Sequence, residues 1–124
     1  MKILVVDDEA DSLELASFIL NGKGAIVLTA GSVDEAMRIF EREQPDLIIS
    51  DIGMSERDGY ELIWELKART DGQPGKIPTV ALTAYAREED GKRLLQAGYN
   101  AYLPKPLEPL QLIETIAELT ANKQ

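Results

Sequence analysis

The chain contains no cysteine and no histidine among its 124 residues. Without cysteine it has no disulfides, no thiolate metal site and no cysteine nucleophile. Without histidine it has neither a zinc site of the usual histidine type nor a Ser-His-Asp triad. Long hydrophobic runs are also missing, and stretches such as ILVV and VAL are too short to span a membrane. Acidic residues follow the first apolar run at once, with no small-residue cleavage site, so we expect a cytoplasmic location.

Basic residues are few: 13 Lys and Arg stand against 22 Asp and Glu, which gives a formal net charge of -9 at pH 7. Non-specific binding to nucleic acid needs a basic surface, so we expect no direct nucleic-acid binding. The hydrophobic content of 44% is ordinary for a globular protein. A chain of this length is large enough to bury one core, which predicts a single domain.

Short apolar segments alternate with segments of helical spacing along the whole chain. We expect strands over residues 2–6, 25–30, 47–50, 77–83 and 100–103. We expect helices after DDEAD up to Gly22 and Gly24, from Ser32 to Pro45, from Asp58 to the polar loop TDGQPGK, over 86–98 and over 109–119. Ser32 and Glu35 form the capping box SVDE. The alternation predicts a doubly wound α/β fold, with a parallel sheet and helices on both of its faces.

Ligands of such a sheet bind beyond the carboxyl ends of its strands, so the residues at these ends are the candidate site. They are Asp7, Asp8 and Glu9 after the first strand, Asp51 after the third, Thr83 at the end of the fourth, and Lys105 after the fifth. Crowded carboxylates without histidine or cysteine form an all-oxygen site that suits Mg²⁺. Lys105 can pair with a carboxylate or a phosphoryl oxygen. Asp51 is then a nucleophile, a metal ligand or both.

Each of these residues also has an ordinary structural explanation when it is taken alone. Asp7 or Asp8 could cap the first helix. Asp51 could be a strand-end carboxylate in a turn. A strand-end threonine is usually a β-former, and a single lysine is usually solvated. Their joint placement at one edge of the sheet favours a functional site.

The segments DDE, SDIGMSERDG, ALTAYA and YLPKP together resemble the CheY-like receiver domains of response regulators in two-component phosphorelay systems. The resemblance runs from Lys2 to about Leu119. It implies one bacterial receiver domain over residues 1–124, with its core over 2–119. The fold it implies is the flavodoxin-like (βα)5 three-layer sandwich, with strand order 2-1-3-4-5.

The resemblance also implies a function. Asp51 looks like the phosphoacceptor, which takes a phosphoryl group from a partner histidine kinase or histidine phosphotransfer protein. Mg²⁺ would be held by Asp8, Asp51 and the backbone carbonyl of Gly53, with Asp7 acting through water. Lys105 would hold a phosphoryl oxygen. A receiver of this kind is a signalling switch and not an enzyme, although it assists its own phosphorylation and dephosphorylation.

Thr83 and Tyr102 resemble the switch pair of the family, in which the aromatic ring follows the movement of the threonine. The Lys105–Pro106 peptide bond is expected to be cis, as receivers typically have it. Phosphorylation would then remodel the surface around the fourth helix, fifth strand and fifth helix, which controls a downstream protein. We expect a monomer or a weak, phosphorylation-dependent dimer.

Four positions near the acceptor depart from the commonest family pattern or vary within it. Ser55 stands where proline is frequent, which predicts a less rigid loop after Asp51. Arg57 replaces a usually apolar residue, which predicts different packing of that loop. Gly53 has no side chain to orient an attacking water, whereas Tyr85 could shield the phosphoryl group. We therefore expect slow self-dephosphorylation.

Three other functions compete with this one. A Mg²⁺-dependent phosphohydrolase with an aspartyl-phosphate intermediate would need the pattern DxD at Asp51, which is absent. A flavodoxin-like module for a nucleotide or flavin would need a phosphate loop after the first strand, where this chain has DDEAD. A degenerate receiver could bind partners without phosphorylation, but the full set of acceptor, acidic pair, threonine and lysine argues against it.

Overall fold

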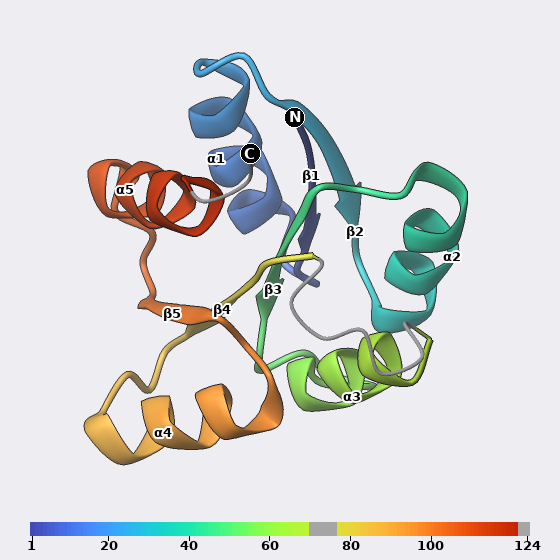
Figure 1. Ribbon diagram of the computed structural model, residues 1–124, viewed down its shortest axis with the longest axis vertical. Coiled ribbons are helices and arrows are strands. Elements are labelled where there is room, and N and C mark those ends of the chain that lie inside the picture. The colour runs from blue at the N-terminus through green and yellow to red at the C-terminus, as the bar shows by residue number, and fades with distance from the viewer. Residues whose placement is uncertain (70–76, 122–124) are drawn as a thin grey trace.

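The computed structural model describes residues 1–69 and 77–121, in which five strands and five helices alternate along the chain (Figure 1). The elements are β1 Lys2–Val6, α1 Ala10–Asn21, β2 Ile26–Ala30, α2 Val33–Glu43, β3 Leu47–Asp51, α3 Gly59–Arg69, β4 Thr79–Thr83, α4 Glu88–Ala97, β5 Ala101–Pro104 and α5 Pro109–Thr120. In these two ranges no helix has the length and apolar character that a membrane crossing requires.

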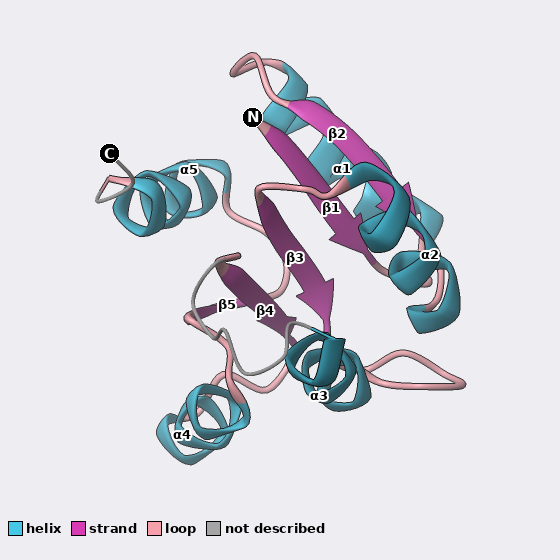
Figure 2. Cartoon of the chain, turned by 45° about the vertical axis from the view of Figure 1, so that its right-hand side comes forward, coloured by secondary structure: helices cyan, strands magenta, loops and turns pink. Residues whose placement is uncertain are grey.

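The five strands form one parallel sheet in the order β2-β1-β3-β4-β5. Val5 of β1 lies opposite Thr29 on one side and Ile49 on the other, and Ile49 in turn lies opposite Val80. Helices cover both faces of the sheet, as Figure 2 shows. The predicted flavodoxin-like, doubly wound fold is confirmed, and its strand order reverses between β1 and β3.

Alternation along the strands divides the core into two halves, because successive side chains point to opposite faces of a sheet. The half under α1 and α5 contains Ile3, Val5, Ala16, Ile19, Leu20, Leu47, Ile49, Val80, Leu82, Leu103 and Leu112. The half under α2, α3 and α4 contains Leu4, Val6, Ile48 and Ala81 with the buried residues of these three helices. Burial on both faces explains why the strands are continuous apolar runs.

The ends of the predicted elements shift by one or two residues. Asp51 is the last residue of β3 and does not follow it. β4 begins at Thr79, after Pro78, which has no N–H to donate to a neighbouring strand. The predicted loop TDGQPGK, residues 70–76, lies outside the described residues.

The capping box at α2 forms with one difference from the usual arrangement. The Ser32 hydroxyl accepts a hydrogen bond from the Glu35 amide at 3.2 Å, as predicted. The Glu35 carboxylate, however, accepts from the amide of Gly31, one residue before the cap. At the other end of α2, Gln44 adopts a left-handed conformation with φ 48° directly before Pro45. The helix therefore ends where proline predicts.

Candidate functional site

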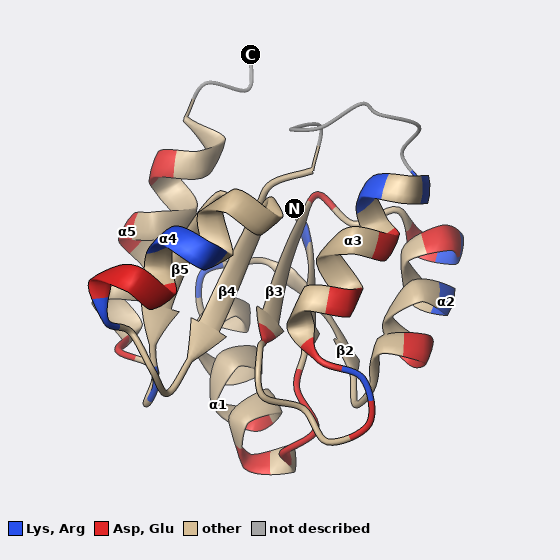
Figure 3. Ribbon diagram, turned by 90° about the horizontal axis from the view of Figure 1, so that it is seen from below, with Lys and Arg blue, Asp and Glu red and all other residues tan. Residues whose placement is uncertain are grey.

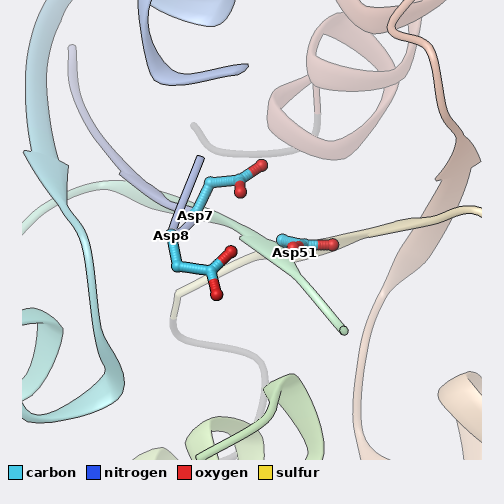
Figure 4. A group of neighbouring side chains, drawn as sticks. All are labelled: Asp7, Asp8 and Asp51. Carbon is cyan, nitrogen blue, oxygen red and sulfur yellow. The ribbon is translucent and has the colours of Figure 1, made fainter. Parts of the chain in front are cut away.

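Three aspartates from two neighbouring strands converge at the carboxyl edge of the sheet (Figure 4). Asp7 and Asp8 directly follow β1, and Asp51 ends β3, which pairs with β1 in parallel. One carboxylate oxygen from each of them can be chosen so that all three oxygens lie within 4.8 Å of one another. Figure 3 shows further acidic residues at the start of α1 and in the loop that leads into α3. The sheet therefore assembles the acidic cluster that the sequence predicts.

Asp7 is the most deeply buried of the three, with 1% of its surface exposed. Its Oδ1 accepts a hydrogen bond from the Glu9 amide at 3.0 Å. Within the described residues its buried Oδ2 receives no hydrogen bond, although the Lys105 ammonium faces it as an ion pair at 3.0 Å. The N-cap of α1 is Glu9, so neither Asp7 nor Asp8 caps this helix, and that alternative is wrong.

The loop after β3 bonds to both other aspartates through its backbone. The Gly53 amide donates to Asp51 Oδ1 at 3.3 Å. The Ser55 amide donates to Asp8 Oδ2 at 3.0 Å. These two bonds fix the orientation of carboxylates that come from different strands, and they place the backbone of Gly53 beside Asp51.

Lys105 brings one ammonium group among the carboxylates. Its Nζ lies 3.0 Å from Asp7 Oδ2, 3.3 Å from Asp51 Oδ1 and 3.3 Å from Glu9 Oε1. Its own amide donates to the Thr83 carbonyl at 2.9 Å, which ties it to the end of β4. The peptide bond between Lys105 and the next residue, Pro106, is cis. Burial opposes the charge of Lys105, but its bonds with Asp7 and Asp51 outweigh burial and raise its pKa.

The pKa of Asp51 is raised, first because the carboxyl group is buried and second because Asp7 is negative. Lys105 and the Gly53 amide act in the opposite direction without cancelling this effect. One ammonium thus leaves the three aspartates with an excess of negative charge. The incompletely bonded Asp7 Oδ2 and the all-oxygen donor set fit a hard divalent cation such as Mg²⁺.

Thr83 of the predicted switch ends β4, which pairs with β3 on the side away from β1, and Tyr102 lies in the next strand, β5. The Thr83 hydroxyl donates to the Tyr85 carbonyl at 3.1 Å and accepts from the Tyr85 amide at 3.0 Å. Among the described residues its hydrogen bonds therefore stay within its own loop and do not reach Asp51. The ring of Tyr102 lies against Gly91 of α4, where an added Cβ would come within 2.2 Å of the ring.

Two features of this region have no counterpart among the predicted site residues. Gly91 leaves the space that the Tyr102 ring occupies, and Arg57 makes three ion pairs. Glu9, which the sequence places after the first strand, shares the ammonium of Lys105. A glycine inside a helical pattern is unusual enough to signal Gly91 from sequence alone. Glu61 lies four residues after Arg57, a spacing that the sequence shows, whereas Asp34 comes from the distant helix α2 and no sequence pattern identifies it.

Known proteins match over nearly the whole chain. The response regulator receiver domain family matches residues 3–117. An uncharacterized 14.6 kDa protein from the sodA1 3' region of Leptolyngbya boryana is 47% identical over 118 residues, which cover 95% of this chain and 88% of that protein. The probable transcriptional regulator ycf27 of Porphyridium aerugineum is 36% identical over 111 residues, which cover 90% of this chain but only 44% of the regulator. A receiver domain protein of Clostridium thermocellum has a crystal structure with a TM-score of 0.86 at 31% identity, covering 98% of this chain and 95% of that one.

The fold and its acidic, lysine-bearing edge define the CheY-like class of α/β domains. The chain belongs to the response regulator receiver domain family, which confirms the resemblance seen in its motifs. Receiver domains of two-component systems generally take phosphate from histidine kinases and act on downstream targets.

Proposed function

We propose that this protein is a phosphorylation-activated signalling switch whose phosphoacceptor is Asp51. The observation that carries this proposal is the position of one Asp51 oxygen, held 3.3 Å from the Lys105 ammonium beside two further carboxylates. The phosphodonor is a histidine kinase or a histidine phosphotransfer protein, and the target is a downstream protein. The protein acts in the cytoplasm, because receiver domains meet their phosphodonors there.

The reaction moves one phosphoryl group from nitrogen to oxygen. Within the described residues the bonds of the Asp51 carboxylate go to Oδ1, so Oδ2 is the oxygen that attacks phosphorus. A P–O bond forms while the donor P–N bond breaks, and the histidine nitrogen leaves with the electron pair and takes up a proton from solvent. When bound, Mg²⁺ supplies positive charge that offsets repulsion between these acids and the phosphoryl oxygens.

The residues around Asp51 divide the remaining work. Asp7, Asp8 and Asp51, with the Gly53 carbonyl, would hold the cation. Lys105 keeps its ammonium beside the Asp51 carboxylate, at Oδ1, and balances the charge that the phosphoryl group brings. The chain binds and orients the group, and it performs no further chemistry on another substrate, so we propose a switch and not an enzyme.

Phosphorylation would then act on the side of Asp51 that carries Thr83. The added phosphoryl oxygens offer a new acceptor to the Thr83 hydroxyl, whose bonds within residues 1–69 and 77–121 go to the backbone of Tyr85. Movement of Thr83 frees space next to β5, and the ring of Tyr102 can follow. The surface of α4, β5 and α5 changes as a result, and a two-state shift of a few kcal/mol is enough to control a partner.

The deciding experiment is the intact mass of the protein after incubation with Mg²⁺ and acetyl phosphate or phosphoramidate. We expect a gain of one phosphoryl group in the wild type, no gain in Asp51→Asn, and no gain after addition of a chelator. No adduct with either donor would overturn the proposal and leave a partner-binding receiver that works without phosphorylation.

The same sample tests the expected slow self-dephosphorylation. Gly53 is exposed, and an added Cβ there would meet no atom within 4 Å, so Gly53→Asn fits without a clash. We expect the adduct of Gly53→Asn to decay several-fold faster than that of the wild type, because its amide can orient the attacking water. Equal decay rates would contradict the role given to Gly53.

A further inference from the structure

Arg57 lies in the loop between β3 and α3 and makes three ion pairs with carboxylates of two helices. Its Nη1 lies 2.5 Å from Asp34 Oδ1 of α2. Its Nε lies 2.9 Å from Glu61 Oε2 and its Nη2 lies 3.2 Å from Glu65 Oε1, both in α3. All the nitrogens of one guanidinium are thus used, and each has a different partner. The apolar packing usual at this position is replaced by charge.

The loop that Arg57 holds is also the loop that bonds to the acidic cluster. It begins at Asp51 and includes Gly53, whose amide donates to the Asp51 carboxylate, and Ser55, whose amide donates to Asp8. A proline at position 55, which is frequent in receivers, has no N–H and could not make the second bond. Figure 3 shows this loop, with both basic and acidic residues, beside α2 and α3, which also carry acidic and basic residues.

The loop is fixed at two places as a consequence. The Ser55 amide ties it to β1 through Asp8, and Arg57 ties it to α2 and α3. The Arg57 side chain is one-third exposed, and a single ion pair of that kind contributes little. Three pairs on one planar group nevertheless restrict where the backbone two residues away can lie. That backbone carries the donor that orients Asp8.

We infer that Arg57 is a positioning residue of the divalent-cation site, holding the loop so that the Ser55 amide orients the Asp8 carboxylate before the cation binds. The inference rests on the proposed function, because it assumes that the acidic cluster binds Mg²⁺. Groups that orient metal ligands commonly change metal affinity by about 10- to 100-fold when they are removed.

The test is the Mg²⁺ dissociation constant of the unphosphorylated protein, measured by calorimetry with MgCl₂ alone. Arg57→Gln keeps much of the side-chain length and removes the charge. The chain offers a matched control, because Arg69 of α3 pairs with Glu41 of α2 and thus joins the same two helices away from the acidic cluster. We expect about a tenfold weaker Mg²⁺ affinity in Arg57→Gln, and a change within about twofold in Arg69→Gln.

Two further readouts separate positioning from general stability. Amide hydrogen exchange of the metal-free protein should be faster at residues 53–58 in Arg57→Gln than in Arg69→Gln. Asp34→Asn removes one partner and leaves the arginine, so it serves if Arg57→Gln fails to fold. It should weaken Mg²⁺ binding in the same direction by a smaller factor.

The outcomes distinguish this inference from the function on which it rests. If the wild type binds Mg²⁺, and both Arg57→Gln and Asp34→Asn bind it with the same affinity, only the role of Arg57 is overturned. Equal weakening in Arg57→Gln and Arg69→Gln would also overturn it, because a general α2–α3 contact would then explain the effect. Absence of Mg²⁺ binding in the wild type would overturn both this inference and the metal-dependent switch.

Discussion

The site around Asp51 has two sides, the acidic cluster with Lys105 and the switch residue Thr83, and they are held in different ways. On one side, Lys105 bonds to three carboxylates, and the loop after β3 bonds to Asp8 and Asp51 through its backbone. Apart from the bond between Gly53 and Asp51, these contacts join residues that are far apart in the sequence. On the other side, the Thr83 hydroxyl bonds to the backbone of Tyr85, two residues later, and to no other group in the part of the chain that the structure describes. Tyr85 is 70% exposed, whereas Asp51 is 5% exposed.

The difference matches what a phosphorylation switch needs. Phosphoryl transfer depends mainly on positioned charges, so the side that holds the cation and the ammonium benefits from being fixed in advance. A change of surface requires an element that few contacts restrain. The helix α4 fits this requirement, because within it only Gly91 and Leu94 are buried. The fixed side can therefore hold the new charge while the other side moves in response.

The largest effect is expected on the fixed side, from Lys105→Met. This change removes the ammonium beside the Asp51 carboxylate, and loss of one such positioned charge typically slows a reaction by about 10²-fold or more. The measurement is the rate of phosphorylation by acetyl phosphate, with Glu9→Gln as the control, since Glu9 is the exposed partner of the same ammonium. A rate close to that of the wild type in Lys105→Met would show that the ion pairs of Lys105 serve the fold and not the reaction.

A smaller effect on the same side is a pH dependence of stability without divalent cations. The pKa of Asp51 is raised in the folded protein by burial and by Asp7, so the unfolded chain loses this proton first. Between the unfolded value, about 3.9, and the raised folded value, the folded state binds more protons and its stability falls as the pH rises. Above that window the cost of the buried charge is fully present.

Asp51→Asn removes this contribution. We expect the variant to be more stable than the wild type near neutral pH, on the order of 1 kcal/mol, with the difference vanishing below pH 4. Urea unfolding of both proteins from pH 3.5 to pH 7 in the presence of a chelator measures it. A difference that stays constant over this range would mean that the titration of Asp51 is not its source.

The smallest effect in free energy is expected on the responsive side, at Gly91. Replacing a helical glycine by alanine normally stabilises a protein by about 1 kcal/mol. Here the added Cβ would lie 2.2 Å from the Tyr102 ring, so the ring must move outwards and the gain is lost. We expect Gly91→Ala to leave stability nearly unchanged while the NMR signals of the Tyr102 ring shift.

A double variant provides the control for Gly91. In the background of Tyr102→Ala there is no ring to displace, so adding Gly91→Ala should recover the stabilisation of about 1 kcal/mol. If Gly91→Ala raised the free energy of unfolding equally with and without the ring, the contact between Gly91 and Tyr102 would not affect stability.

Local patterns in the sequence were enough to predict the fold class and the groups that meet at one edge of the sheet. The strands are short apolar runs, and in the helices apolar residues recur every three or four positions. Both patterns involve only residues that are close together in the sequence. Parallel strands bring their carboxyl ends to one edge, so Asp7, Asp8, Asp51 and Lys105 had to lie near one another once alternation was recognised. The family motifs then supplied the strand order.

Which of these groups bond to one another depends on three-dimensional packing and could not be predicted. The pair between Arg57 and Asp34 joins residues 23 positions apart, and that between Lys105 and Glu9 joins residues 96 positions apart. Such contacts depend on the packing distance between helices and on side-chain rotamers, which no local pattern fixes. The same holds for the bond of the Ser55 amide to Asp8 and for the packing of the Tyr102 ring against Gly91. Sequence periodicity places residues on a face, whereas three-dimensional packing determines the atoms that they touch.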